Sequence, residues 1–381
     1  MNARPPASAA GTIALGGDLP VNRLGFGAMR LTGKEIWGDP PDRTQAIAAL
    51  RRAVDLGVNF IDTADAYGPS VSENLIAEAL HPYPDGLVIA TKGGLVRPGP
   101  YRWERDGRPG HLRKACEDSL KRLRLEQIPL YQLHKPDPRV PFGDSVGTLA
   151  DLQAEGKVRH IGISTVTEDQ LLEAQQAAPI ASVQNRYSAV DRSSQGVLDL
   201  CAALGLAFIA WAPVKQTEAN SAVAAIARQR GTWHYQVALA WLLAMSPVML
   251  PIPGTASPAH VEANVAAAAF ELTAEETAAI TACVLSAERF DPGQPTIASA
   301  VTDSAGLRLR RSRQAESTRV SRPFDCRDTV PNVSASRYLG ADCEGGSVAE
   351  CSSPDCGTAA TRRRMASICQ LAGVCRGNLA A

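Results

Sequence analysis

The sequence predicts a (β/α)8 TIM barrel that starts with a β-hairpin and is followed by a C-terminal tail of low order. Three observations support this fold class. Eight short apolar runs alternate with amphipathic stretches, polar residues gather where those runs end, and the regular pattern stops near residue 290. Eight successive strand–helix units favour a closed barrel over a doubly wound sheet. The predicted parts are a flexible N-terminus at 1–11, the barrel at 12–290 and the tail at 291–381.

A hairpin is expected before the first barrel strand. The segment Thr12–Val21 has two short strand-like halves on either side of Gly16 and Gly17. Two successive glycines suit the positive φ angles of a tight hairpin turn. We expect this hairpin to cover the floor of the barrel.

Two periodicities place the strands and helices of the barrel. Short apolar runs bounded by polar residues or glycine predict buried strands at 23–28, 59–62, 87–92, 130–134, 160–164, 181–184, 207–211 and 248–252. Apolar residues spaced three or four apart predict helices at 43–57, 72–80, 111–123, 144–156, 168–177, 193–204, 218–230 and 257–269. Two additional helices are expected near 234–244 and 273–285.

The tail differs from the barrel in composition. Residues 291–381 contain twelve Arg, nine acidic residues and no Lys, with many Ser and Gly and no sustained apolar period. Six of the nine cysteines lie there, but their closest spacings, C-x4-C and C-x5-C, do not match paired zinc ligands, and we predict no metal site. The tail is interpreted as a disordered extension or as an out-of-frame read-through past the natural stop.

Charge and hydropathy exclude several classes of protein. The 39 basic residues balance the 39 acidic ones, so the chain lacks the basic excess expected of a nucleic-acid or anionic-membrane binder. The first eleven residues have no apolar core typical of a secretory signal, and no run reaches 18 apolar residues. We therefore expect a soluble, cytoplasmic protein that acts on a small molecule, in an oligomeric state that the sequence leaves open.

Polar side chains at the predicted strand ends form a chemically coherent set. Because active sites of barrels lie at the carboxyl ends of the strands, we expect Asp62, Tyr67, Lys92 and His134 to lie close together. Lys92, kept charged by Asp62, would lower the pKa of Tyr67. His134 would donate a hydrogen bond to a carbonyl oxygen, while the hydride for a reduction must come from a nicotinamide cofactor. Taken singly, each residue also fits a structural role as a buried histidine, an ion pair or a helix cap.

Five ordered motifs carry a resemblance to a known family. They are Asp62-Thr-Ala-Asp-Ala-Tyr67, Thr91-Lys92, Tyr131-Gln-Leu-His134, Gly162-Ile-Ser164 and Ile252-Pro-Gly-Thr-Ala-Ser-Pro-Ala-His260 with Asn264. In this order, over residues 23–285, they resemble the aldo-keto reductase superfamily, most of all its bacterial pyridoxal reductase (pyridoxine 4-dehydrogenase)-like members. The resemblance implies an NADP-dependent carbonyl reductase with Asp62, Tyr67, Lys92 and His134 as the catalytic tetrad and Tyr67 as proton donor.

The cofactor site is expected at the later strand ends. The resemblance implies that Ser164 and Gln184 bind the nicotinamide carboxamide, that Trp211 lies under the ring and that Asn264 contacts the adenine. Independently, Ser257 and Pro258 resemble the start of a helix after the turn Gly254-Thr255, and a helix start attracts a phosphate. An ordinary capped helix is the alternative. The residues of this segment expected to bind the cofactor are Gly254, Thr255, Ser257, His260 and Asn264.

The chain departs from the family pattern at several of these positions. Thr165 and Ala263 replace the usual Asn and Glu, and the loop after the seventh strand lacks glycine but contains Lys215. His260 replaces an Arg that often pairs with the 2′-phosphate, so NADPH is expected and NADH is possible.

Substrate choice is expected to depend on residues 93–110, a loop rich in Arg and Trp that follows the third strand. These residue types suit a planar or anionic carbonyl compound, and pyridoxal is the preferred candidate. Two alternatives stay open. One is an NADP(H)-binding, redox-sensing subunit with little turnover, and the other is a Schiff-base lyase that uses Lys92 as nucleophile.

Overall fold

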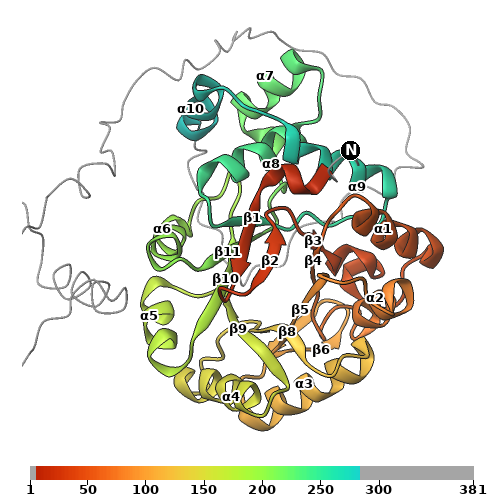
Figure 1. Cartoon of the computed structure of the whole chain (residues 1–381), viewed down its shortest axis with the longest axis vertical. Coiled ribbons are helices and arrows are strands. Elements are labelled where there is room, and N and C mark those ends of the chain that lie inside the picture. The colour runs from red at the N-terminus through yellow and green to blue at the C-terminus, as the bar shows by residue number, and fades with distance from the viewer. Residues whose placement is uncertain (1–5, 284–381) are drawn as a thin grey trace, which may run out of the picture. The chain divides into compact units, whose positions relative to one another are not determined.

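The computed structural model describes residues 6–283 and shows a parallel sheet curled into a barrel, with helices around it (Figure 1). The eight strands follow one another in chain order around the sheet, from β3 (Phe26–Gly27) to β12 (Met249–Pro251). The first and last strands also meet, because Gly25 N–H donates to the Pro251 carbonyl at 3.0 Å and Gly27 N–H to the Pro253 carbonyl at 3.2 Å. The predicted (β/α)8 fold is confirmed.

All eight predicted strands are present. After β3 they are β4 (Phe60–Asp62), β5 (Val88–Gly93), β8 (Ile128–Leu133), β9 (Val158–Ser164), β10 (Ile180–Arg186), β11 (Ala207–Trp211) and β12. Each neighbouring pair is parallel. Parallel strands that enter from the same end place their carboxyl ends at one rim, so the polar residues predicted there gather at a single mouth.

The predicted helices are also present, some of them shortened. They are α1 (Arg43–Asp55), α2 (Val71–Leu80), α3 (Pro109–Leu123), α4 (Phe142–Ala154), α5 (Glu168–Ala177), α6 (Gln195–Leu204), α7 (Ser221–Arg230), α8 (His234–Met245), α9 (Pro258–Val265) and α10 (Ala274–Ala282). The stretch predicted as one helix at 257–269 divides into α9 and the 3-10 helix η5 (Ala266–Ala269). Likewise η4 (Thr217–Ala219) precedes α7 because Asn220 caps that helix and accepts from Val223 N–H.

The predicted N-terminal hairpin is made of β1 (Thr12–Leu15) and β2 (Leu19–Asn22). Leu15 and Val21 are fully buried in an apolar cluster that includes Phe60, Val88 and Leu130 of the barrel strands. At the turn, Asp18 pairs with Arg159 and His160 at the start of β9. The hairpin therefore closes the amino-terminal end of the barrel, at the end opposite to the mouth.

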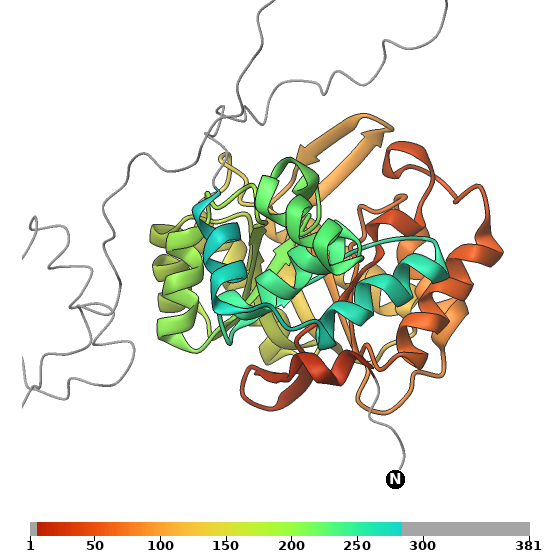
Figure 2. The same ribbon diagram turned by 90° about the horizontal axis from the view of Figure 1, so that it is seen from above.

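Two local structures differ from the sequence-based description. Residues 93–110 are not an irregular loop, because β6 (Leu95–Gly99) and β7 (Arg102–Arg105) pair as an antiparallel hairpin that projects from the mouth, shown in orange in Figure 2. Within the N-terminus predicted to be flexible, Pro6–Ala10 form the 3-10 helix η1 and Ala7 is fully buried. Residues 291–381, predicted as a low-order tail, lie outside the described residues.

Within residues 6–283, no helix is both long and apolar enough to cross a membrane. The same part of the chain contains no group of three His, Cys, Asp or Glu side chains arranged to hold a metal ion.

Candidate active site

A buried ion pair lies at the centre of the mouth. Lys92, the penultimate residue of β5, donates through Nζ to Asp62 Oδ2 at 2.6 Å and to the Thr63 carbonyl at 2.8 Å. Its third contact is Tyr67 Oη at 3.4 Å. Lys92 is 1% exposed, so a charge on it depends on these partners rather than on water.

Two glutamines complete the surroundings of Asp62. Gln132 on β8 donates through Nε2 to Asp62 Oδ1 at 3.1 Å, and Gln184 on β10 donates to the same oxygen at 2.6 Å. The two amides also bond to each other at 3.2 Å. Gln132 was not predicted as a site residue, although a glutamine inside an otherwise apolar strand indicates a polar partner in the barrel. Gln184, expected only at the cofactor, also supports the ion pair.

Burial and the charge of Lys92 act in opposite directions on the pKa of Tyr67. Burial raises the pKa of Tyr67 above its usual value, and the nearby Lys92 ammonium offsets only part of that rise. Lys92 thus lowers the pKa of Tyr67 as expected, but burial outweighs this effect, because a buried phenolate loses more hydration than one ammonium returns. For Lys92, burial disfavours the charged form, but the Asp62 carboxylate and Tyr67 raise its pKa overall. Tyr67 is accordingly a protonated phenol next to a charged lysine.

His134 lies beside Tyr67, one residue past the end of β8. Its main-chain N–H donates to the Gly93 carbonyl at 2.9 Å, which fixes the backbone at the rim. The rings of Tyr67 and His134 meet edge to face with centroids 5.7 Å apart. Burial, with a smaller contribution from the charges of Lys92 and Lys135, holds the pKa of His134 well below its usual value. His134 is thus neutral, with one N–H to donate and no positive charge.

The residues predicted to bind a cofactor lie at the ends of the later strands. Ser164 ends β9, Gln184 lies on β10 and Trp211 ends β11, with Ser164 and Gln184 buried. Gly254 approaches the first strand so closely that a Cβ there would lie 2.3 Å from the Gly27 carbonyl oxygen. Only glycine permits this contact, which brings the turn at 254–255 next to the first strand.

The start of α9 is suited to an anion. Ser257 is the N-cap with Pro258 as the first helical residue, and the Ser257 side chain makes no capping hydrogen bond. Thr255 Oγ1 accepts from Ser257 N–H at 3.1 Å, which stabilises the turn before the helix. His260 and Asn264 both lie on α9, as predicted. The first backbone N–H groups of this helix are left for a phosphate, favoured by the helix dipole.

Positive side chains near this turn were missed by the sequence analysis. Arg30 Cγ would lie 3.7 Å from a Cβ at Gly254, and the Arg186 guanidinium is 5.9 Å from the Trp211 ring centroid. Burial, followed by the charges of Arg186 and Arg30, lowers the pKa of Lys215, so the three cations share one region. Arg186 ends β10 and Arg30 lies three residues beyond β3, so each is two residues beyond the predicted strand ends at 184 and 28.

Thr165, which replaces the Asn usual in the family, adopts a left-handed backbone with φ of 58°. Its N–H donates to the Gln184 carbonyl at 3.0 Å, so the turn after β9 is held in place. A β-branched residue is unfavourable in this conformation, whereas Asn tolerates it. The departure therefore leaves both a missing carboxamide and a strained backbone.

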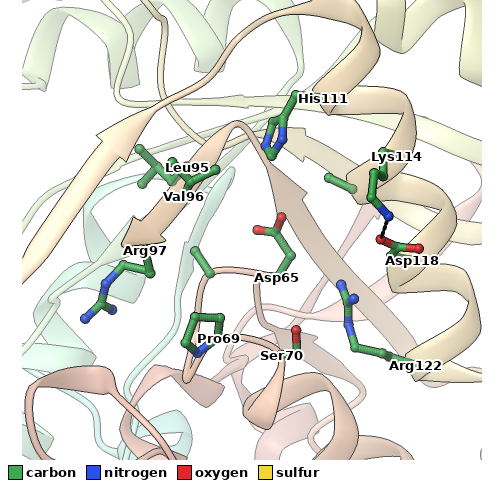
Figure 3. Close-up of a pocket in the computed structure, with 12 residues that line it drawn as sticks. Asp65, Pro69, Ser70, Leu95, Val96, Arg97, His111, Lys114, Asp118 and Arg122 are labelled. Atoms are coloured by element: carbon green, nitrogen blue, oxygen red, sulfur yellow. Dashed lines mark hydrogen bonds and ion pairs between the residues drawn. The ribbon is translucent and has the colours of Figure 1, made fainter. Parts of the chain in front are cut away.

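A cavity of about 240 Å3 lies on the outer side of the Tyr67 loop, between that loop, β6 and α3 (Figure 3). Asp65 points into it toward His111, and neither Asp65 Oδ1 nor His111 Nε2 has a hydrogen-bond partner among the described residues. Burial, and then the charge of Glu73, raise the pKa of Asp65 well above its usual value. The loop that carries Tyr67 thus contains, two residues earlier, a buried carboxyl group with one unpartnered oxygen.

Comparison with known proteins identifies the family of this chain. The model of the Aldo/keto reductase family matches residues 23–285. The chain belongs to the aldo/keto reductase family. It is therefore an NADP-dependent oxidoreductase, as the sequence predicts.

Its relatives include an uncharacterized oxidoreductase of Schizosaccharomyces pombe, 48% identical over 272 residues that cover 71% of this chain and 88% of the relative. Pyridoxine 4-dehydrogenase of Escherichia coli is 41% identical, covering 68% and 93%. Among solved structures, an aldo/keto reductase of Klebsiella pneumoniae in complex with NADP and acetate is 27% identical, with a TM-score of 0.61 and coverage of 74% and 97%. A glycerol dehydrogenase of Gluconobacter oxydans is 28% identical, with a TM-score of 0.63 and coverage of 71% and 94%.

Proposed function

We propose that this protein reduces an aldehyde or ketone to an alcohol, using NADPH, with Tyr67 as the proton donor. The observation that carries the proposal is the contact of Tyr67 Oη with the ammonium of Lys92, whose charge is maintained by Asp62 at 2.6 Å. A phenol gives up its proton readily only when a neighbouring cation stabilises the phenolate that remains.

Each member of the set has a separate task. His134, neutral and edge-on to Tyr67, donates a hydrogen bond that orients the carbonyl oxygen and stabilises its developing negative charge. Tyr67 transfers its proton to that oxygen, and Lys92 stabilises the resulting phenolate until solvent restores the proton. Asp62, Gln132 and Gln184 are positioning residues that fix Lys92. The nicotinamide cofactor, when bound, supplies the hydride to the carbonyl carbon.

The later strand ends fit a nicotinamide dinucleotide phosphate. Trp211 at the end of β11 provides an aromatic surface for the nicotinamide ring, and Ser164 at the end of β9 binds the carboxamide. Because Gln184 Nε2 is committed to Asp62, the contact of Gln184 with the carboxamide falls to its oxygen. The N-terminus of α9, with Thr255, Ser257 and His260, receives the 2′-phosphate, and Asn264 the adenine.

Arg30 and Lys215, which lie close to Gly254 and Arg186, add positive charge for the pyrophosphate. We propose NADPH as the preferred cofactor, with NADH as a weaker substitute because His260 is a poorer partner for the 2′-phosphate than arginine.

Pyridoxal is the proposed substrate, supported by the relative named pyridoxine 4-dehydrogenase at 41% identity. The Schiff-base alternative is disfavoured, because Asp62 raises the pKa of Lys92 and keeps the amine protonated and non-nucleophilic.

The first test measures initial rates of NADPH oxidation with pyridoxal and with benzaldehyde, and repeats both with NADH. Preference for pyridoxal is expected. Turnover of benzaldehyde alone would keep the reductase and remove the proposed substrate. Cofactor binding without turnover would favour the redox-sensing subunit.

The proton donor is tested by Tyr67→Phe. We expect kcat to fall by about 10²–10⁴-fold while the dissociation constant for NADPH, measured by fluorescence, stays the same. Tyr83→Phe is the matched control, since its hydroxyl donates to the Leu123 carbonyl at 2.6 Å, away from the mouth. Full activity of Tyr67→Phe would overturn the assignment.

A further inference from the structure

Arg97 on β6 is almost buried, at 7% exposure, although the sequence suggested an arginine available to a substrate. Its guanidinium donates to main-chain carbonyls of two separate segments. It bonds to the Ile36 carbonyl at 2.9 Å and to the Glu35 carbonyl at 3.0 Å, both in η3 (Lys34–Ile36). It also bonds to the Arg102 carbonyl at 3.1 Å and to the Pro100 carbonyl within its own hairpin. Within the Arg- and Trp-rich segment 93–110, the Arg97 guanidinium is therefore occupied by main-chain carbonyls.

Two tryptophans lie near the same guanidinium. Its central carbon is 3.8 Å from the Trp103 ring centroid, a distance typical of stacking, and 5.6 Å from the Trp37 ring centroid. Arginine suits this position because its planar group can stack on a ring and still donate hydrogen bonds at its edges. The flat face of the Arg97 guanidinium thus stacks on Trp103 of the β6–β7 hairpin, while its N–H groups donate to carbonyls of the η3 segment. Arg97 therefore links the hairpin to this segment.

The η3 segment is in turn attached to the loop that carries Tyr67. Gly38 N–H donates to the Gly68 carbonyl at 2.6 Å, and Gly68 N–H to the Ile36 carbonyl at 3.3 Å. Glu35 and Ile36 both have left-handed backbones, with φ of 58° and 59°, a conformation that costs energy for side chains other than glycine. The carbonyls of these two residues are the ones that Arg97 binds, so Arg97 stabilises the conformation that meets Gly68.

Trp103 extends from the hairpin toward the proposed catalytic residues. Its ring centroid is 6.5 Å from that of His134, with the rings at 76°. Trp103 as a whole residue is 39% exposed even though the Arg97 guanidinium stacks on its ring, so the residue remains accessible to a ligand. A planar group whose carbonyl lies between Tyr67 and His134 would lie within reach of this ring.

We infer that Arg97 is a positioning residue that holds Trp103 beside His134 as an aromatic wall, and that this wall selects planar aromatic carbonyl compounds over small aliphatic ones. The inference rests on the proposed reductase function and specifies its substrate class. Arg97 itself does not touch the substrate. Its role is exerted through Trp103 and through the η3 segment.

The test compares Arg97→Met and Arg97→Lys with the wild type, using benzaldehyde and propanal. For both variants we expect KM for benzaldehyde to rise about three- to tenfold, the loss expected for one aromatic contact, while KM for propanal and both kcat values change little. Arg97→Lys is not expected to restore the KM for benzaldehyde, because an ammonium cannot stack on the Trp103 ring and also donate to carbonyls of both the hairpin and the η3 segment. Trp103→Ala should reproduce the change.

Arg102→Met is the matched control, because this arginine lies on the same hairpin, is 67% exposed and forms an ion pair only with Glu104 among the described residues. Its kinetics should equal those of the wild type. Hydrogen exchange of residues 95–105 and 34–38 provides a readout that needs no turnover, and Arg97→Met should speed exchange in both segments.

The outcomes distinguish failure of the roles of Arg97 and Trp103 from failure of the proposed reductase function. Unchanged exchange in Arg97→Met would overturn the role of Arg97 as a clamp. Faster exchange with an unchanged ratio of the two KM values would overturn Trp103 as the selective wall. Failure of the wild type to reduce either aldehyde would instead overturn the proposed function, while the exchange data would still decide whether Arg97 clamps the hairpin.

Discussion

The two ends of the barrel are built from the same strands but from opposite kinds of side chain. On β4, Phe60 faces the apolar floor under the hairpin, and Asp62, two residues later on the same face, binds Lys92 at the mouth. On β5, Val88 and Ala90 belong to the floor, and Lys92 to the mouth. Alternation along a strand places residues i and i+2 on one side, so a single inward face changes from apolar to charged over one repeat.

This difference separates stability from chemistry. Burial of Leu15, Val21 and Phe60 stabilises the fold without regard to charge. The mouth contains an ion pair that is shielded from water. Removing these two charges from water costs free energy, and this cost is offset because several donors converge on Asp62. Changes at the floor should therefore affect stability alone, and changes at the mouth should affect both stability and turnover.

The largest effect is expected from Lys92→Met, which leaves the Asp62 carboxylate buried without its cation. We expect the free energy of unfolding to fall by about 3–5 kcal/mol, with loss of turnover. Urea denaturation measures the first and NADPH oxidation the second. The double variant Asp62→Asn with Lys92→Met removes the isolated charge and should be more stable than the single variant. Equal stability of Lys92→Met and the wild type would contradict a buried charged pair.

At the floor, Leu15→Ala removes a fully buried side chain from the hairpin that covers the barrel. The resulting cavity should lower the free energy of unfolding by about 2–4 kcal/mol. Because this position is at the far end from Tyr67, kcat measured below the unfolding temperature should match that of the wild type. A reduced kcat with intact folding would show that the two ends are coupled.

Asp65→Asn examines the buried carboxyl group whose Oδ1 has no partner in the cavity next to the Tyr67 loop. Because the folded-state pKa of Asp65 is raised, the folded protein retains a proton that the unfolded chain releases above about pH 4, so this group makes stability fall as pH rises. The amide removes that dependence. We expect the melting temperature of Asp65→Asn to exceed that of the wild type by roughly 2–4 °C at pH 8 and by less at pH 5. Asp118→Asn, on the rim of the same cavity and paired with Lys114, is the control.

The smallest effect is expected from Thr165→Asn. Asparagine tolerates the left-handed backbone at this position, so the variant should be about 1 kcal/mol more stable by urea denaturation. If Asn also restores the family's contact with the nicotinamide carboxamide, KM for NADPH should fall. A loss of stability would mean that the contact of the Thr165 hydroxyl with Ser164 Oγ at 3.4 Å stabilises the fold by more than the left-handed backbone of Thr165 destabilises it.

Much of the fold was predictable from the sequence because it depends on local patterns. Runs such as 207–211 became strands with the predicted ends, and Gly16-Gly17 formed the expected turn. The hairpin at 95–105 was missed, since the exposed residues of β7 lack the alternating pattern of a half-buried strand and β6 and β7 pair with each other outside the barrel sheet. Gln132 was missed because its partners Asp62 and Gln184 lie on other strands, and Arg30 and Arg186 because only the fold brings them near Gly254 and Trp211.

The sequence by itself determined the strand–helix order and hence the rim at which Asp62, Tyr67, Lys92 and His134 meet, because spacing along the chain sets which residue ends each strand. Only the tertiary structure decided the electrostatic state of that rim and the use of Arg97. Burial raises the pKa of Tyr67 although the charge of Lys92 lowers it, and the Arg97 guanidinium donates its hydrogen bonds to backbone carbonyls. Desolvation and hydrogen-bond partners depend on what surrounds a group in three dimensions, and residue type and sequence spacing do not specify them.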